Sequence, residues 1–170
     1  AAKLNVIQIH IAFLPVRWKS NMAPSDPFNI YPFRKTAMRD LVWDKTLSVA
    51  VDEIDEDHRR LVELFNIFKH SVVDDESPEY RAAVLEELIA CTVWHFKHEE
   101  RLMLKYNYPK FAGHKTEHRE LIESAAAFQQ KYLQDGGKMS EADFEYLDHW
   151  LTEHILVVDM KLGEWLAGVM

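Results

Sequence analysis

Seven side chains that could bind metal ions recur through the last two thirds of the chain. They are five histidines and two carboxylates: His58, His95, Glu99, His114, His118, His154 and Asp159. His95 and Glu99 are four residues apart, as are His114 and His118, so on a helix the members of each pair share one face. Four helices that aimed these side chains at a common centre would build a nitrogen-rich site for two metal ions.

A polar core without metal is the alternative explanation for these histidines. A single histidine on an apolar helix face is more often a hydrogen-bonded core residue than a ligand. Burying seven such groups together without a metal would carry a severe desolvation cost, because buried polar groups need partners. A metal ion removes this cost by taking neutral imidazoles and carboxylates as ligands. We therefore favour a metal site.

The number and type of these side chains also indicate how the metal is held. Seven ligands are too many for one ion and suit two ions bridged by the carboxylates. Nitrogen and oxygen ligands fit iron, although residue type leaves manganese, zinc and copper open. If both carboxylates and one solvent-derived oxygen bridge, three histidines complete an octahedron on one ion. The other ion then has two histidines and one open position for a small ligand.

Apolar periodicity predicts the helices that would carry these ligands. We expect helices from about Asp55 to Val73, from Pro78 to about Tyr106 with Ser77 as N-cap, from beyond Gly113 to about Leu133, and from a Ser140–Asp143 capping box to Asp159 or beyond. Short turns between them predict an all-α fold, an antiparallel up-down-up-down four-helix bundle. Residues 41–54 would precede it as an N-terminal arm with Trp43 as its anchor.

One spacing does not suit a regular helix. Asp159 follows His154 by five residues, about 140° around an ideal α-helix. If both residues face the same metal site, the helix must be locally distorted. The spacing therefore predicts a π-type turn near the site.

Charge and cysteine content limit the class of protein. The chain of 170 residues has a net charge of −8, which argues against nucleic acid as a partner. Its one cysteine, Cys91, excludes an internal disulfide framework and fits a buried thiol in a reducing compartment. No apolar run approaches the ~18 residues needed to span a bilayer, so we expect no membrane insertion. These features predict a cytoplasmic protein.

Residues 1–39 differ from the rest. They hold six basic side chains and one acidic one, which leaves 14 of the 20 basic and 27 of the 28 acidic side chains for residues 40–170. A signal peptide is one explanation of the short apolar run from Val6 to Val16, although no clear cleavage site follows it. We prefer a flexible N-terminal extension that is not homologous to the bundle at 40–170, with Met38 as a candidate natural start.

The strings around the seven ligands carry a specific resemblance. They are Asp-Glu-Asp-His-Arg-Arg-Leu at 55–61, His-Phe-Lys-His-Glu-Glu-Arg-Leu-Met at 95–103, Tyr108-Pro109, His114-x-x-x-His118, and Trp150-Leu151-x-x-His154-Ile155-x-x-x-Asp159. From about residue 40 to its end the chain resembles the hemerythrin family, in particular the bacterial hemerythrins. The resemblance implies a centre of two non-haem iron ions, with a bridging oxo or hydroxo group, that binds O2 reversibly.

By this similarity each predicted residue has an expected role. His114, His118 and His154 would hold the closed iron, His58 and His95 the open iron, and Glu99 and Asp159 would bridge. The O2 pocket would be formed by Phe96, Trp150, Leu151 and Ile155. His70, His98 and His149 are not expected to be ligands and should titrate in or near solvent, whereas His10 lies outside the domain.

The resemblance implies a binding protein and not an enzyme. We expect a monomer whose partner is O2 and that carries, stores or supplies oxygen, for example to an oxygen-consuming enzyme. Two alternatives from other classes are an oxygen or redox sensor, and a di-iron enzyme acting on iron, nitric oxide or peroxide.

Overall fold

The structure, a computed structural model, describes residues 39–170, which contain helices and no strand. The predicted N-terminal extension, apart from Arg39, and His10 lie outside the described residues. The elements are α1 (Asp52–Val73), α2 (Pro78–Lys105), α3 (Phe111–Gln134), α4 (Glu141–His154), the π-helical turn η1 (Ile155–Asp159) and α5 (Met160–Ala167). Because α4, η1 and α5 follow one another without a break, they form a single continuous helical segment.

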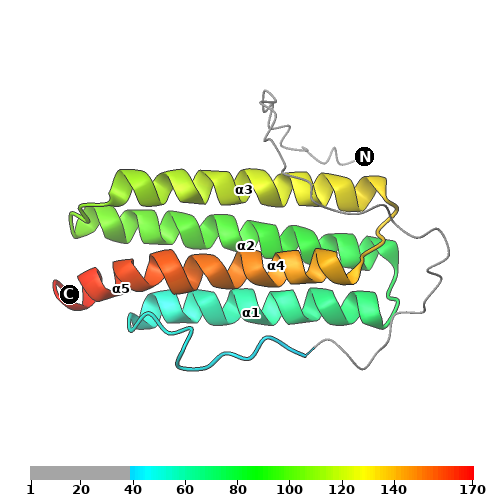
Figure 1. Cartoon of the computed structure of the whole chain (residues 1–170), viewed down its shortest axis with the longest axis horizontal. Helices are drawn as coiled ribbons and strands as arrows, with labels where there is room; N and C mark the ends of the chain where they lie inside the picture. Colours follow the sequence, from blue (N-terminus) through cyan, green and yellow to red (C-terminus); the bar gives the residue numbers. More distant parts are fainter. Residues whose placement is uncertain (1–38) are drawn as a thin grey trace, which may run out of the picture. The chain divides into compact units, whose positions relative to one another are not determined.

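The helices lie side by side and alternate in direction along the chain, as Figure 1 shows. α1 contacts α2, and α2 contacts α3, so neighbours in sequence are neighbours in space. The polar turns between helices are short, from four to six residues. The predicted all-α, antiparallel four-helix bundle is therefore confirmed.

Local sequence explains where the helices begin. Ser77 caps α2 by accepting a hydrogen bond from the Tyr80 N–H, and Pro78 occupies the first helical position, as predicted. Ser140 and Asp143 form the predicted capping box at the start of α4. Capping fixes the first turn of each helix because it satisfies N–H groups that have no partner within the helix.

Two helices begin earlier than the sequence pattern predicts. α1 begins at Asp52 and not Asp55, because the Asp55 N–H already donates a helical hydrogen bond to the Val51 carbonyl at 2.8 Å. The Asp55 carboxylate binds the arm. It accepts hydrogen bonds from the Val49 N–H at 2.8 Å and the Ser48 hydroxyl at 2.5 Å. α3 begins at Phe111 and not after Gly113, since the helical turn tolerates this glycine.

The fourth helical segment contains the predicted distortion. η1 is a π-helical turn over Ile155–Asp159, between two stretches of α-helix. A π turn holds more residues than an α turn, which reduces the angular offset between His154 and Asp159. Both side chains therefore face the bundle interior, where Asp159 is fully buried.

The arm before α1 is held at several points. Buried Leu47, Val49 and Val51 pack into the core, while Trp43, the predicted anchor, is only partly buried under the Arg59 guanidinium. The residues just before the arm are held by the buried Lys69 of α1. Its ammonium donates to the Asp40 carboxylate at 2.5 Å and to the Arg39 carbonyl at 2.8 Å. The arm is thus fixed by packing and by hydrogen bonds together.

The core of the bundle is apolar on both sides of the polar region where the ligand candidates gather. Phe68, Phe144, Leu85 and Leu88 are among the fully buried apolar side chains. The predicted buried thiol, Cys91, is only partly buried. None of the helices within residues 39–170 has the length and apolar character needed to cross a bilayer.

Candidate metal centre

The seven predicted ligands come together inside the bundle. α1 supplies His58, α2 supplies His95 and Glu99, and α3 supplies His114 and His118. His154 is the last residue of α4, and Asp159 is the last residue of η1. All seven are buried, with exposed fractions between 0 and 7%. The i, i+4 pairs on α2 and α3 face inward together, as their spacing predicts.

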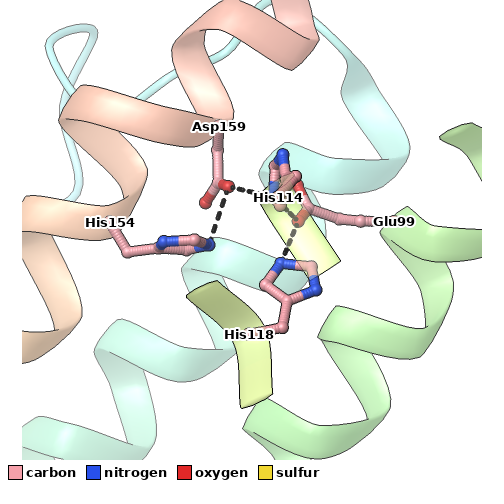
Figure 2. A group of neighbouring side chains, drawn as sticks. All are labelled: Glu99, His114, His118, His154 and Asp159. Carbon is pink, nitrogen blue, oxygen red and sulfur yellow. Dashed lines mark hydrogen bonds and ion pairs between the residues drawn. The ribbon is translucent and has the colours of Figure 1, made fainter. Parts of the chain in front are cut away.

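Three histidines and two carboxylates form the first cluster. His114 Nε2 lies 3.3 Å from Glu99 Oε2 and 3.2 Å from Asp159 Oδ1. His118 Nε2 lies 3.2 Å from Glu99 Oε2, and His154 Nε2 lies 3.1 Å from Asp159 Oδ1. Figure 2 shows the three imidazoles turned toward the two carboxylates. One ligand atom from each residue lies within 4.8 Å of those of the others, close enough for one ion.

Two further histidines form a second cluster with the same carboxylates. His58 Nε2 lies 3.3 Å from Asp159 Oδ2 and 3.2 Å from His95 Nε2. His95 Nε2 lies 3.9 Å from Glu99 Oε2. Ligand atoms of these four residues also lie within 4.8 Å of one another. Glu99 and Asp159 therefore belong to both clusters, and the histidines divide three to two.

These clusters include five polar atoms that have no hydrogen-bond partner within residues 39–170. They are Glu99 Oε1, both carboxylate oxygens of Asp159, and the Nε2 atoms of His114 and His154. His154 Nε2 lies close to Asp159 but makes no well-aligned hydrogen bond with it. Buried polar groups without partners are costly and therefore rare. Nitrogen and oxygen atoms that lie close together without hydrogen bonds are typical of metal ligands. These residues are therefore suited to hold a pair of metal ions.

Comparison with known proteins identifies the relatives of this bundle. The hemerythrin HHE cation binding domain family matches residues 49–166, which is more than half of the chain. The chain belongs to the hemerythrin family. Bacteriohemerythrin of Stenotrophomonas maltophilia is 35% identical over 117 residues, covering 68% of this chain and 74% of that protein. Bacteriohemerythrin of Pseudomonas paraeruginosa is 29% identical over 150 residues, covering 78% of this chain and 97% of that protein.

A solved structure agrees with this identification. The crystal structure of a wild-type hemerythrin aligns with a TM-score of 0.67 at 28% identity, covering 75% of this chain and 98% of that chain. Together with the buried histidines and carboxylates, membership of the family supports a non-haem di-iron domain that binds O2.

The electrostatics of the hemerythrin site depend on the balance between burial and opposite charge. Burial and the neighbouring Asp159 would raise the pKa of Glu99, but His95, His114 and His118 outweigh them and lower it to about 2. Burial would also raise the pKa of Asp159, which His154 and other histidines hold well below its usual value. Burial lowers the pKa of His114, yet Asp159 and Glu99 raise it to about 9. Both carboxylates are therefore ionised at neutral pH, as metal ligands must be.

The four predicted pocket residues line one small cavity beside both clusters. Phe96, Trp150, Leu151 and Ile155 share it with ligand candidates His95, His154 and Asp159, and with Leu61, Thr92 and Leu121. Its volume is about 10 Å³, close to what one small molecule of the size of water needs. The Phe96 ring stacks on the His118 ring at 3.9 Å, and the Trp150 Nε1–H is satisfied by Ser124 Oγ at 3.1 Å.

Three of the candidate histidine ligands have an acidic partner near their outer nitrogen that the sequence pattern did not predict. His95 Nδ1 lies 3.4 Å from Asp57 Oδ2, and His118 Nδ1 lies 3.5 Å from Glu100 Oε1. His154 Nδ1 lies 3.9 Å from Glu117 Oε2. Such partners orient an imidazole and fix which nitrogen faces a metal. Asp57 and Glu100 directly precede or follow a predicted ligand in sequence, which is the only signal that could have revealed them.

The three histidines not expected to be ligands stay outside both clusters. His70 and His149 are exposed and pair with Asp40 at 3.0 Å and Glu153 at 2.8 Å. His98 is the least exposed of the three. Its side chain is only 13% exposed and lies between two carboxylates, because α2 turns it toward α1 and not toward water.

Proposed function

We propose that this domain binds O2 reversibly at a pair of iron ions. In this proposal His114, His118 and His154 hold one iron, His58 and His95 hold the other, and Glu99 and Asp159 bridge them. The observation that supports it is the pair of overlapping clusters, which share both carboxylates but divide the histidines unequally. The iron with fewer histidines is the one with a free position for a small ligand.

The chain's own residues would hold the iron and exclude water. Bound iron would supply the electrons with which O2 is held and later released. The two carboxylates offset part of the metal charge, and the five imidazoles fill most of the remaining positions. The cavity formed by Phe96, Trp150, Leu151 and Ile155 is also lined by His95 and His154, one proposed ligand of each iron, which supports an apolar wall beside the proposed open position. Excluding water there suppresses side reactions.

We propose a binding role and not an enzymatic one. The protein would carry, store or supply O2, for instance to an oxygen-consuming enzyme, and would act as a cytoplasmic monomer. A single cysteine supports a reducing compartment, and the net charge of −8 argues against nucleic acid as a partner. A histidine-rich ligand set supports reversible binding, because strongly oxidising di-iron sites usually contain more carboxylates.

The test is to reduce the iron-loaded protein, add O2, and then remove the O2 under vacuum while recording the visible spectrum. We expect two iron ions per chain and a coloured form that appears with O2 and disappears on its removal. Prompt irreversible oxidation with substrate turnover would instead indicate an enzyme and contradict the proposal. A coloured form that binds O2 but changes affinity for a partner would indicate a sensor.

A matched pair of variants checks the assignment of the open iron. We expect His58→Ala to abolish the reversible spectrum, because it removes one of the two histidines proposed for that iron. His149→Ala makes the same change at a side chain that is 73% exposed and should behave like the unsubstituted protein. Equal O2 binding by both variants would refute the role of His58.

A further inference from the structure

A buried carboxylate joins two imidazoles at the contact between α1 and α2. Asp57 Oδ2 lies 2.6 Å from His98 Nδ1 and 3.4 Å from His95 Nδ1. Asp57 is 8% exposed and lies on the outer nitrogen of His95, on the side away from the His58 contact at His95 Nε2. The same carboxylate thus contacts a proposed ligand and a histidine that is not one.

The contacts continue from His98 to the surface. His98 Nε2 lies 3.2 Å from Glu53 Oε2, and the Trp94 ring lies 5.2 Å from the His98 ring. Glu53 and Asp57 are four residues apart on α1, so both carboxylates face α2. His98 is therefore held on both ring nitrogens, and its position is fixed by α1 as well as by its own helix.

The other proposed ligands lack such an arrangement. His58 Nδ1 and His114 Nδ1 have no hydrogen-bond partner among the described residues. The partner of His118 is Glu100 at 3.5 Å, which pairs with Lys115 at 3.0 Å but is 21% exposed. The partner of His154 is Glu117 at 3.9 Å, which is half exposed. Among the five histidines, His95 alone has a buried carboxylate that is itself anchored by a further side chain.

We propose that His98 is a positioning residue for the open iron, which it affects through Asp57 and His95. The inference rests on the proposed function, because it concerns one ligand of the same site. His98 binds Asp57 by the shorter of the two contacts and so sets the orientation of the carboxylate. Asp57 then accepts the His95 Nδ1–H, which leaves Nε2 to face the metal.

The His98–Asp57 contact is shorter than the His95–Asp57 contact, so His98 restrains the Asp57 carboxylate that in turn orients the His95 ring. A hydrogen bond of 2.6 Å restrains a carboxylate more strongly than one of 3.4 Å. Without His98, the Asp57 side chain would be free to rotate away from His95, and water from the α1–α2 surface could replace it. The His95 ring would then lose its fixed orientation, and the iron that it holds would dissociate more easily.

The test compares His98→Leu, His98→Gln, Asp57→Ala and the control His149→Leu in the fully iron-loaded, reduced protein without O2. Two measurements are made: the rate of iron loss to an added chelator, and the hyperfine-shifted NMR signal of the His95 Nδ1–H with its exchange in D2O. Loss of an outer partner typically costs about 10–100-fold in metal affinity. We expect iron loss about 10–100-fold faster in Asp57→Ala and about 3–10-fold faster in His98→Leu, with a shifted and faster-exchanging signal.

The remaining variants separate positioning from a general effect on folding. His98→Gln keeps an N–H donor for Asp57 and should restore iron retention and the NMR signal to near the unsubstituted values. His149→Leu should change neither. The proposal is overturned if His98→Leu retains iron and the His95 signal unchanged while Asp57→Ala alters both, or if His98→Gln fails to restore a defect. Because neither measurement uses O2, failure of the O2-binding proposal would be seen separately, as an unsubstituted protein without a reversible spectrum.

Discussion

Leu151 shows how a side chain that does not bind metal could still decide what the site does. It is buried, lines the cavity beside the clusters, and lies one helical turn before Ile155, which lines the same cavity. Water that enters this cavity would solvate the bound O2. It would favour departure of the O2 as a reduced, charged species, which leaves the iron oxidised. An apolar wall excludes that water because it offers no hydrogen bonds.

We expect Leu151→Thr to accelerate oxidation of the O2-bound protein. A hydroxyl in the cavity would favour entry of water by about 1–2 kcal/mol, which corresponds to roughly tenfold in rate. The measurement is the decay of the O2-bound spectrum in air. Leu156→Thr, at a position that is 46% exposed, is the matched control and should decay at the original rate. Equal decay of Leu151→Thr and the unsubstituted protein would argue against a role for this wall.

At the level of single residues, the sequence predicted the clustered ligands better than their partners. His95, Glu99, His114 and His118 could be placed because i, i+4 spacing fixes their common face without any knowledge of neighbouring helices. Asp57 could not, since its role depends on the rotation of α1 against α2. Only the packed structure reveals the contact of Asp57 with His95.

Helix α5 illustrates a constraint that acts between elements. Gly163 in α5 lies against the arm, where an added Cβ would overlap the Val49 carbonyl oxygen and approach the Val49 Cβ within 2.8 Å. The Val49 N–H is itself bound to Asp55, so the arm cannot easily move away. The absence of a side chain at this position allows the arm and α5 to pack directly.

We expect Gly163→Ala to lower the free energy of unfolding by about 1–3 kcal/mol, the usual cost of overpacking in a well-packed region. Gly113→Ala in α3 is a matched control, because a Cβ there meets no atom within 4 Å. That substitution should be neutral or stabilise by up to about 1 kcal/mol, since alanine favours a helix over glycine. Urea denaturation of both variants makes the measurement, and equal stabilities would disprove the close contact.

At the level of elements, predictions were sound where local chemistry decides the outcome. The capping residues Ser77 and Ser140 mark helix starts because they satisfy the first N–H groups in place. The π turn was predictable from the distance between His154 and Asp159 once both were taken as ligands. The start of α1 was predicted three residues late, because its first turn is closed by the Asp55 N–H and the Val51 carbonyl, and no side-chain cap within the described residues marks it.

At the scale of the whole molecule, the packing of the bundle must offset the desolvation free energy of its buried ionisable groups. A core of aromatic and aliphatic side chains surrounds five imidazoles and two carboxylates that lie almost entirely out of water. Without metal, histidines whose pKa is raised, such as His114, stabilise the site as ion pairs with the carboxylates, whereas burial lowers the pKa of His118. With metal, the same histidines must be neutral. Metal-free and metal-bound protein should therefore respond to pH in opposite ways.

His114 provides the sign of this response. In the metal-free protein burial lowers its pKa, but Asp159 and Glu99 raise it from 6.5 to about 9. Because this pKa is higher in the folded than in the unfolded state, protonated His114 stabilises the folded protein. This contribution is complete below pH 6.5 and is lost as the pH rises toward 9. The lowered pKa values of Glu99 and Asp159 act at the other end, since their contribution is lost only as the medium becomes strongly acidic.

We therefore expect the free energy of unfolding of the metal-free protein to fall, on the order of 2 kcal/mol, between pH 6.5 and 9. Over the same range iron should bind more tightly, because fewer protons compete with it for His114. Denaturant titrations of both forms at several pH values make the measurement. His114→Gln should remove most of the slope from the metal-free protein, whereas His149→Gln should preserve it. If metal-free protein kept constant stability from pH 6.5 to 9, the ion pairs around His114 would not be what holds its charged centre together.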